Sequence, residues 1–344
     1  MHFASDNNSG VCPEVLDALA AESARTAPAY GNDPTSAALV ERLTEVFEHP
    51  VEVYPVATGT ASNSVALAAM NPPWGGVVCE TEAHVAVDEL SAPTVLGNGL
   101  TLMPLHGTDG RLDPGALSRF LELQVDDVHW VPPTTLSLTN STEAGTVYQA
   151  EDVWALAQIA RAEGLGVHMD GARFANAVAA TGATPAQLTW QSGVDVLCLG
   201  ATKCGAVAAE AIVVFRPEAV TSPERHRKRT GHLLSKQRLV AAQFLGWLAD
   251  DAWLRHAIHA NSLAARLAEG FVAAGHQPVH PVETNMVFLH LPHAVAKDWH
   301  AAGAEFYVLP TPDPAVGLAR FVTSWSTTDA EVDALLALAS STTP

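Results

Sequence analysis

Short apolar runs alternate with longer amphipathic stretches through the first two thirds of the chain. A short apolar run bounded by turn residues is typical of a buried strand, and apolar positions three and four residues apart indicate a helix. The predicted strands cover residues 51–56, 76–80, 100–104, 128–131, 135–138, 166–169, 196–199 and 212–215. The predicted helices cover residues 13–27, 36–47, 64–70, 114–123, 150–163 and 174–180. This alternation predicts an α/β fold with a mostly parallel sheet and helices on both faces.

The pattern changes after Pro217. Residues 233–274 predict a long helical stretch that breaks near Asp250. The strands predicted beyond it cover 286–291, 305–309 and 318–325, and the helices cover 293–302 and 329–340. A chain of 344 residues exceeds the usual size of a single core, so we expect two domains. The larger covers residues 1–245, and a smaller C-terminal α+β domain covers 246–344.

Polar residues that follow the predicted strands are the candidates for a ligand site. In an open parallel sheet, ligands bind beyond the carboxyl ends of the strands. The residues at these positions are Gly59, Thr60, His84, Thr139 to Thr142, Asp170, Arg173 and Lys203. We therefore expect them to lie at one edge of the sheet.

Lys203 stands between the apolar run 196–199 and the small residues 205–209. Burial among such residues disfavours an ammonium, lowers the pKa of the amine and makes it available as a nucleophile. A lysine that forms a Schiff base needs this property. On the local sequence alone, an ordinary loop lysine that extends to solvent is the alternative.

Two further motifs favour the Schiff-base interpretation. An aspartate that ends one strand, a lysine after a later strand and a Gly-Thr turn upstream are the arrangement expected for pyridoxal 5'-phosphate. Lys203 would condense with its aldehyde, and Asp170 would keep its pyridine nitrogen protonated. Gly59 and Thr60 lie in the turn between a predicted strand and a predicted helix, where backbone N–H groups can hold a phosphate. A turn of this kind that only caps the helix is the alternative. His84 is placed to stack on the ring, or it is a histidine bonded locally at a helix start.

Two arginines are candidates for binding anionic groups. Arg173 lies about one helical turn beyond Asp170, close enough to reach the phenolic oxygen of the cofactor or a substrate carboxylate. Arg320 follows a strand of the small domain and could hold an α-carboxylate through two hydrogen bonds. An arginine at such a position is otherwise an ordinary surface residue.

Composition and charge limit which partners and which cellular compartment we expect. The formal net charge of −19 argues against nucleic acid and against an anionic membrane as partners. The four cysteines show no zinc-site spacing with histidine, so we expect no metal site. The N-terminus does not resemble a signal peptide, and no apolar run is long enough to span a bilayer. A cytoplasmic location is the resulting expectation.

Seven segments resemble, in order, the low-specificity L-threonine aldolase family. This family belongs to the β-eliminating lyase group of fold-type-I pyridoxal-phosphate enzymes. The segments are 5–7 (Ser-Asp-Asn), 30–34 (Tyr-Gly-Asn-Asp-Pro), 59–63 (Gly-Thr-Ala-Ser-Asn), 82–84 (Glu-Ala-His), 168–173 (His-Met-Asp-Gly-Ala-Arg), 200–203 (Gly-Ala-Thr-Lys) and 320–323 (Arg-Phe-Val-Thr). The resemblance implies an aspartate-aminotransferase-like large domain. It also implies cleavage of a β-hydroxy-α-amino acid, typically L-threonine or L-allo-threonine, to glycine and an aldehyde.

The resemblance also implies a role for each matching residue. The catalytic residues would be Lys203, Asp170 and His84, with His84 or a water that it holds as the candidate base. The cofactor would contact Gly59, Thr60, Ala61, His84, Asp170, Arg173, Lys203 and Lys228. The substrate would contact Ser5, Tyr30, Thr142, Arg173 and Arg320. Lys228 matches a position near the phosphate of a neighbouring subunit, so we expect a homodimer or homotetramer with shared active sites.

One segment departs from the family pattern. Many members carry Glu-Asn-Thr-His-Asn after the strand that precedes the Asp-Gly-Ala-Arg motif, whereas residues 139–143 here are Thr-Asn-Ser-Thr-Glu. Thr142 can hydrogen-bond a hydroxyl group but cannot act as a base near neutral pH. The replacement leaves the stereochemical preference and turnover open, and it is compatible with bulkier substrates such as β-phenylserine.

Two other functions stay open on the sequence. Lysine and aspartate in these roles also serve β-elimination, racemisation and transamination of amino acids with the same cofactor. A non-catalytic sensor that binds pyridoxal phosphate is the other possibility. Such a sensor would normally carry a DNA-binding or partner-binding module, and this acidic chain shows none.

Overall fold

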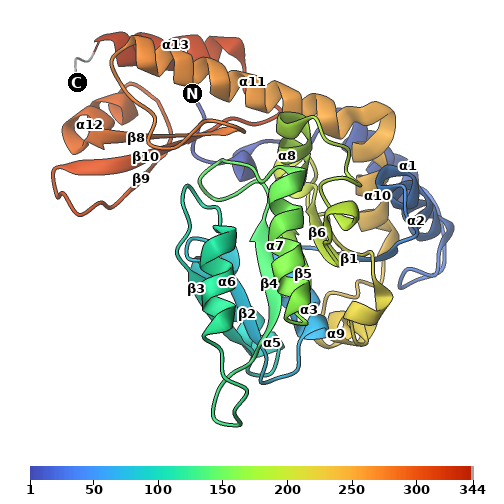
Figure 1. The fold of residues 1–344 in the computed structure, drawn as a ribbon. Helices are drawn as coiled ribbons and strands as arrows, with labels where there is room; N and C mark the ends of the chain where they lie inside the picture. Colours follow the sequence, from blue (N-terminus) through green and yellow to red (C-terminus); the bar gives the residue numbers. More distant parts are fainter. Residues whose placement is uncertain (342–344) are drawn as a thin grey trace.

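A seven-stranded sheet with its covering helices forms the larger part of the structure, which we call the larger layer (Figure 1). The computed structural model describes residues 1–341. The strand order is β1-β7-β6-β5-β4-β2-β3. The strands are β1 (Glu52–Val56), β2 (Gly76–Glu80), β3 (Thr101–Leu105), β4 (Pro133–Thr139), β5 (Gly166–Gly171), β6 (Val196–Gly200) and β7 (Glu210–Val214). Only β7 runs against its neighbours, so the predicted mostly parallel sheet is confirmed.

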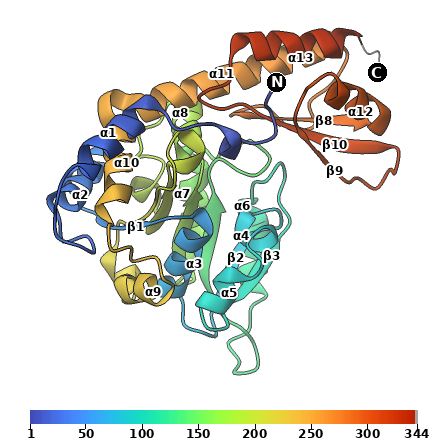
Figure 2. The same cartoon turned by 180° about the vertical axis from the view of Figure 1, so that it is seen from behind.

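Helices cover both faces of this sheet because its central strands are apolar on both sides. In β6, Leu197 and Leu199 pack into the core on one face, while Val196 and Cys198 pack against α3 on the other. Figure 1 shows α6, α7 and α8 over one face, and Figure 2 shows α3 over the opposite face. The helices of this layer are α1 (Pro13–Ser23), α2 (Pro34–Phe47), α3 (Gly59–Met70), α4 (His84–Val87), α5 (Ala92–Leu96), α6 (Pro114–Glu122), α7 (Ala150–Ala162), α8 (Phe174–Thr181), α9 (Pro223–Arg229) and α10 (Arg238–Leu248).

The C-terminal residues form a smaller antiparallel sheet of order β8-β10-β9. Its strands are β8 (Met286–Pro292), β9 (Tyr307–Leu309) and β10 (Val316–Val322), and the helices around it are α11 (Ala252–Ala273), α12 (His293–Ala301) and α13 (Asp329–Ser341). Phe3 lies in the same core as Trp299 and Phe321, although it comes from the N-terminus. The division at residues 245 and 246 stays a prediction, and the N-terminal segment contributes to the smaller core as well.

Two predictions about these elements differ from the structure, and a third is confirmed. The strand predicted at 128–131 is wrong, because Val128 and Trp130 lie exposed in a turn and the strand starts at Pro133. Helix α3 starts at Gly59 instead of residue 64, so the Gly-Thr motif is its first turn. The break near Asp250 is confirmed: left-handed φ values of 48° and 54° at residues 250 and 251 separate α10 from α11.

Candidate active site

A cavity of about 380 Å³ opens at the end of the central strands. It is lined by the loop after β1, the start of α3, the start of α4, the end of β5, the turn after β6 and the start of β7. Five residues selected from the sequence line it, namely Gly59, Thr60, His84, Asp170 and Lys203. Residues chosen because they follow predicted strands, up to 144 positions apart (59 to 203), therefore line the same cavity.

Lys203 sits in a single 3₁₀ turn, η3 (Thr202–Cys204), between β6 and β7. The N–H of Ala201 donates to the carbonyl of Ala209 at 3.0 Å and closes the base of this turn. Gly205 ends the turn with a φ of 105°, which disfavours any residue with a Cβ. A Cβ there would also lie 3.0 Å from the Sγ of Cys12. The turn thus holds the half-buried Lys203 at a fixed place on the cavity wall.

Asp170 is the penultimate residue of β5 and is almost completely buried. Its Oδ2 accepts a hydrogen bond from the Nδ2 of Asn63 at 2.8 Å, and its Oδ1 accepts one from the N–H of Ala172 at 3.0 Å. Hydrogen bonds to both oxygens stabilise the carboxylate form and fix its orientation. Asn63 belongs to a segment of the family pattern, but its role at Asp170 is visible only in the structure.

His84 is held by a carboxylate that the sequence analysis missed. The Nδ1 of His84 lies 2.9 Å from Oε1 of Glu89, which is buried and also accepts from Asn63 at 2.8 Å. The hydrogen bond to Glu89 raises the pKa of His84, although burial opposes this shift. Burial in turn raises the pKa of Glu89. A continuous chain of hydrogen bonds therefore joins His84 to Asp170, and the five-residue spacing of His84 and Glu89 is its only sequence signal.

Arg173 forms a buried ion pair with Asp6 from the N-terminal segment. The Nε of Arg173 donates to one oxygen of Asp6 at 2.6 Å, and its second nitrogen donates to the other at 3.1 Å. Asn285 of the smaller layer also donates to Asp6 at 3.1 Å. Burial alone would raise the pKa of Asp6, but the charges of Arg173 and Lys203 lower it. Asp6 belongs to segment 5–7 of the family resemblance, but the sequence analysis assigned it no role. Its partner Arg173 is too distant in the chain for a local pattern to reveal the pair.

Arg320 lies beside a second cavity of about 310 Å³, which Glu143 and His280 also line. Its guanidinium stacks 5.1 Å above the ring of Tyr307, and one nitrogen donates to the carbonyl of Ala4 at 3.4 Å. Burial and the charge of Arg173 lower the pKa of Arg320. The two arginines are thus close enough to influence each other, although Arg320 does not line the cavity at Lys203.

Three other predicted residues do not line the Lys203 cavity. The Oγ of Ser5 accepts from the N–H of Asn7 at 3.2 Å, and it is Asn7 that reaches the cavity. The N–H of Ala61 donates to the cap residue of α3. Thr142 is fully buried, and its hydroxyl lies 2.8 Å from that of Thr146. Direct contact of these three side chains with a ligand stays a prediction.

Tyr30 and Lys228 lie together, away from the Lys203 cavity. The Nζ of Lys228 lies 5.4 Å from the centroid of the Tyr30 ring, and half of Tyr30 is exposed. Tyr30 lines a separate cavity of about 720 Å³, whose wall includes Arg227 and Gln237. Neither residue lines the Lys203 cavity of the same chain.

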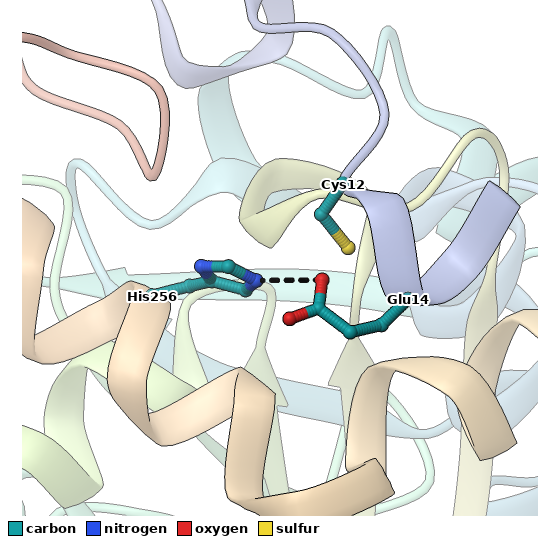
Figure 3. Close-up of side chains that lie close together, drawn as sticks. All are labelled: Cys12, Glu14 and His256. Atoms are coloured by element: carbon teal, nitrogen blue, oxygen red, sulfur yellow. Dashed lines mark hydrogen bonds and ion pairs between the residues drawn. The ribbon is translucent and has the colours of Figure 1, made fainter. Parts of the chain in front are cut away.

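A further cluster of Cys12, Glu14 and His256 joins α1 to α11 (Figure 3). The donor atoms lie within 4.8 Å of one another, and Oε2 of Glu14 is 3.2 Å from Nε2 of His256. The other oxygen of Glu14 pairs with Arg255 at 3.3 Å. Burial raises the pKa of Cys12 to about 11, so its thiol keeps its proton. These contacts describe a structural link behind the Lys203 turn.

Comparison with known proteins identifies the family. The sequence model of the family described as beta-eliminating lyase matches residues 2–294. The chain belongs to the beta-eliminating lyase family. It is 42% identical to the low specificity L-threonine aldolase of Pseudomonas aeruginosa, over 94% of this chain and 93% of that protein. It is 39% identical to the enzyme of the same name from Pseudomonas sp., over 97% and 96% of the two chains. The resemblance stated from the seven segments is thereby confirmed.

Solved structures confirm the expected fold-type-I architecture. The threonine aldolase of Leishmania major superposes with a TM-score of 0.92 at 25% identity, over 98% of each chain. The serine palmitoyltransferase of Sphingomonas wittichii gives 0.73 at 13% identity over 99% of this chain and 86% of the other, and this likeness concerns the fold alone. Within residues 1–341, no helix is long and apolar enough to cross a membrane.

Proposed function

We propose that this lyase cleaves β-hydroxy-α-amino acids to glycine and an aldehyde with pyridoxal 5'-phosphate. The proposed substrates are L-threonine and L-allo-threonine, with β-phenylserine as a bulkier one. One observation carries the proposal: Lys203, Asp170 and His84 line a single cavity, and Glu89 is hydrogen-bonded to His84 from behind. The same chain is 42% identical to a low specificity L-threonine aldolase over almost its whole length.

The residues around the cavity fit the proposed cofactor. Helix α3 points its first turn at the cavity, and the hydroxyl of the cap residue Thr58 accepts only from the N–H of Ala61. The backbone N–H groups of Gly59 and Thr60 find no acceptor in residues 1–341, and a Cβ on Gly59 would meet nothing within 4 Å. An open helix start of this kind suits a phosphate. Asp170, with both oxygens oriented, suits a protonated pyridine nitrogen.

Each side chain around the cavity would have a separate role toward the cofactor or the substrate. The bound cofactor would supply an electron sink for the electron pair released at the α-carbon. Lys203 would hold its aldehyde carbon covalently, and Asp170 would keep a proton on its ring nitrogen. Arg320 and the remaining nitrogen of Arg173 would bind the substrate carboxylate, since Asp6 already occupies the other two nitrogens of Arg173.

His84 is the proposed base for the β-hydroxyl proton. Its Nδ1 faces Glu89, and its Nε2 has no hydrogen-bond partner in the described chain. A carboxylate behind the ring orients the imidazole and stabilises it when it takes up a proton. The raised pKa of His84 makes it a stronger base than an isolated histidine. Thr142 does not replace it, because its hydroxyl is buried against Thr146.

We also propose a homodimer or homotetramer in the cytoplasm, in which Tyr30 and Lys228 complete the active site of a neighbouring subunit. The cavity at Tyr30 and the exposed half of its ring support such a contact. Light scattering of the purified protein tests the oligomer. Lys228→Ala should weaken cofactor binding in an oligomer, and unchanged binding would contradict the shared site.

An absorbance spectrum tests the proposed function directly. The purified protein with pyridoxal phosphate should show a visible band that is lost in Lys203→Ala. L-Threonine, L-allo-threonine or phenylserine should then give equal amounts of glycine and aldehyde. A band without aldehyde would favour β-elimination, racemisation or transamination, and a stable band without any turnover would favour a sensor. Absence of the band in the wild type would exclude the cofactor.

A further inference from the structure

Glu210 is a buried acid in the cavity that the mechanism above does not use. It is the first residue of β7 and is 6% exposed. In the sheet register it lies opposite Val56 of β1 and Gly200 of β6. From Val56 the chain continues to Gly59, and from Gly200 it continues to Lys203. Glu210 therefore lies between the proposed phosphate site and the proposed Schiff-base lysine.

The carboxyl group of Glu210 faces the cavity over Gly200. A Cβ on Gly200 would lie 2.8 Å from Oε2 of Glu210 and 2.8 Å from the carbonyl oxygen of Ala172, so only glycine fits between them. Ala172 follows Asp170 at the end of β5. The acid thus extends across β6 toward the residues that hold Asp170, and both acids line the same space.

No cation is paired with Glu210. The charged groups that face it are Lys203 from the turn after β6, which favours the carboxylate, and Asp170 from β5, which opposes it. Thr202 also acts to lower the pKa of Glu210, but burial outweighs both Thr202 and Lys203. No ion pair joins Glu210 to Lys203 or to another basic residue anywhere in residues 1–341. A buried carboxylate without a paired cation is costly, so such a group tends to keep its proton.

Asp170 and Glu210 differ in the hydrogen-bond donors that reach them. Two hydrogen bonds stabilise the carboxylate of Asp170. Burial raises the pKa of Glu210 to about 7. When two acids share a buried site, the one with the better donors ionises and the other stays protonated.

We propose that Glu210 is a positioning residue that keeps its proton while the anionic cofactor is bound, so that Asp170 is the only ionised acid facing it. The proposal rests on the proposed cofactor. A neutral Glu210 adds no repulsion to a phosphate at Gly59 and Thr60. It also leaves Lys203 without an ion-pair partner in the cavity. Ionisation of Glu210 above neutral pH would weaken cofactor binding.

The test is the dissociation constant of pyridoxal phosphate for the apoprotein, measured by fluorescence from about pH 6 to about pH 9. Glu210→Gln has nearly the same shape but stays neutral, and the exposed Glu218→Gln changes the net charge equally outside the cavity. Wild type and Glu210→Gln should bind alike at the acid end. Toward the alkaline end the wild type should become weaker, by up to about tenfold per pH unit, because its acid must take up a proton. Glu218→Gln should follow the wild type.

Two results would overturn the proposal while leaving the proposed function intact. One is a ratio of the two dissociation constants that does not change with pH. The other is binding to Glu210→Gln that is at least about tenfold weaker at the acid end, which would show a carboxylate paired with Lys203. A wild type that binds no pyridoxal phosphate would overturn both proposals. If Glu210→Gln does not fold, Glu210→Met supplies another neutral side chain, with the same pH-independent binding expected.

Discussion

The Lys203 cavity and the neighbouring N-terminal clasp both contain charged side chains, but these are paired in the clasp and partly unpaired in the cavity. We define the clasp as Asp6, Arg173 and Asn285. In the clasp, both oxygens of Asp6 are paired, and the three side chains join the N-terminal segment to both layers. In the cavity, Lys203 has no ion-pair partner among residues 1–341, and Nε2 of His84 has no hydrogen-bond partner there. Groups that are fully paired hold the fold, whereas groups left with free bonding capacity are available to a ligand.

Removal of the lysine should separate the two regions most strongly. Lys203→Ala should lower turnover at least about ten-thousandfold, as removal of a covalent catalyst does in other enzymes. Its free energy of unfolding should change by less than about 0.5 kcal/mol, because no paired charge is left behind. Steady-state kinetics and urea unfolding measure both quantities. A large loss of stability would place Lys203 with the structural charges instead.

The opposite result is expected in the clasp. Asp6→Asn leaves the buried guanidinium of Arg173 without its counter-charge, so it should lower the free energy of unfolding by about 3–5 kcal/mol. Exposed Asp17→Asn is the matched control and should change it by less than about 0.5 kcal/mol. Urea unfolding of apoprotein measures the difference without interference from ligand. Equal stability of the two variants would show that the clasp is dispensable.

The same ion pair sets a dependence of stability on pH. Because the pKa of Asp6 is lower in the folded protein than in the unfolded chain, its contribution is complete above the unfolded value of about 3.9. That contribution is lost as the pH falls through the folded pKa. The difference in stability between wild type and Asp6→Asn should therefore shrink below about pH 4. A constant difference down to strongly acid pH would contradict this origin.

Glu89 should have a smaller and more specific effect on turnover. Glu89→Gln weakens the hydrogen bond that raises the pKa of His84, so the acid limb of kcat/KM should move to lower pH. Turnover near neutral pH should fall about tenfold to a hundredfold, because the imidazole loses its orientation. A pH profile separates this role from a purely structural one. An unshifted acid limb would assign the base to another group.

The smallest effect is expected at Glu14, whose cluster resembles an active site only in its residue types. Glu14→Gln should lower the free energy of unfolding by at most about 1 kcal/mol, because its pairs with Arg255 and His256 are partly solvated. Activity should not change. A loss of turnover would extend the functional region from the Lys203 cavity to α1.

The sequence was informative where function depends on residues at strand ends. Lys203, Asp170 and His84 lie at or shortly after the ends of apolar strands, so the strand pattern located them. Their roles came from the accompanying motifs and the family resemblance. Glu210 and Asp6 were missed, because one follows a run of small residues and the other is paired with a residue 167 positions away. The strand predicted at 128–131 failed because its apolar side chains lie in an exposed turn. The local sequence pattern therefore predicts which residues line the cavity. Contacts between residues that are distant in the sequence determine which of their side chains are paired.

The buried Phe3 limits how the two layers can move. Phe3 is fixed in the smaller core and Asp6 in the larger layer, with Ser5 already extended at a φ of −162°. Three residues can span only about 10 Å, so this short tether has almost no slack. A wide hinge opening would have to extract either the phenyl ring or the carboxylate from its place. Entry to the cavity is therefore expected to depend on side-chain and loop displacements, with the two layers travelling as one body.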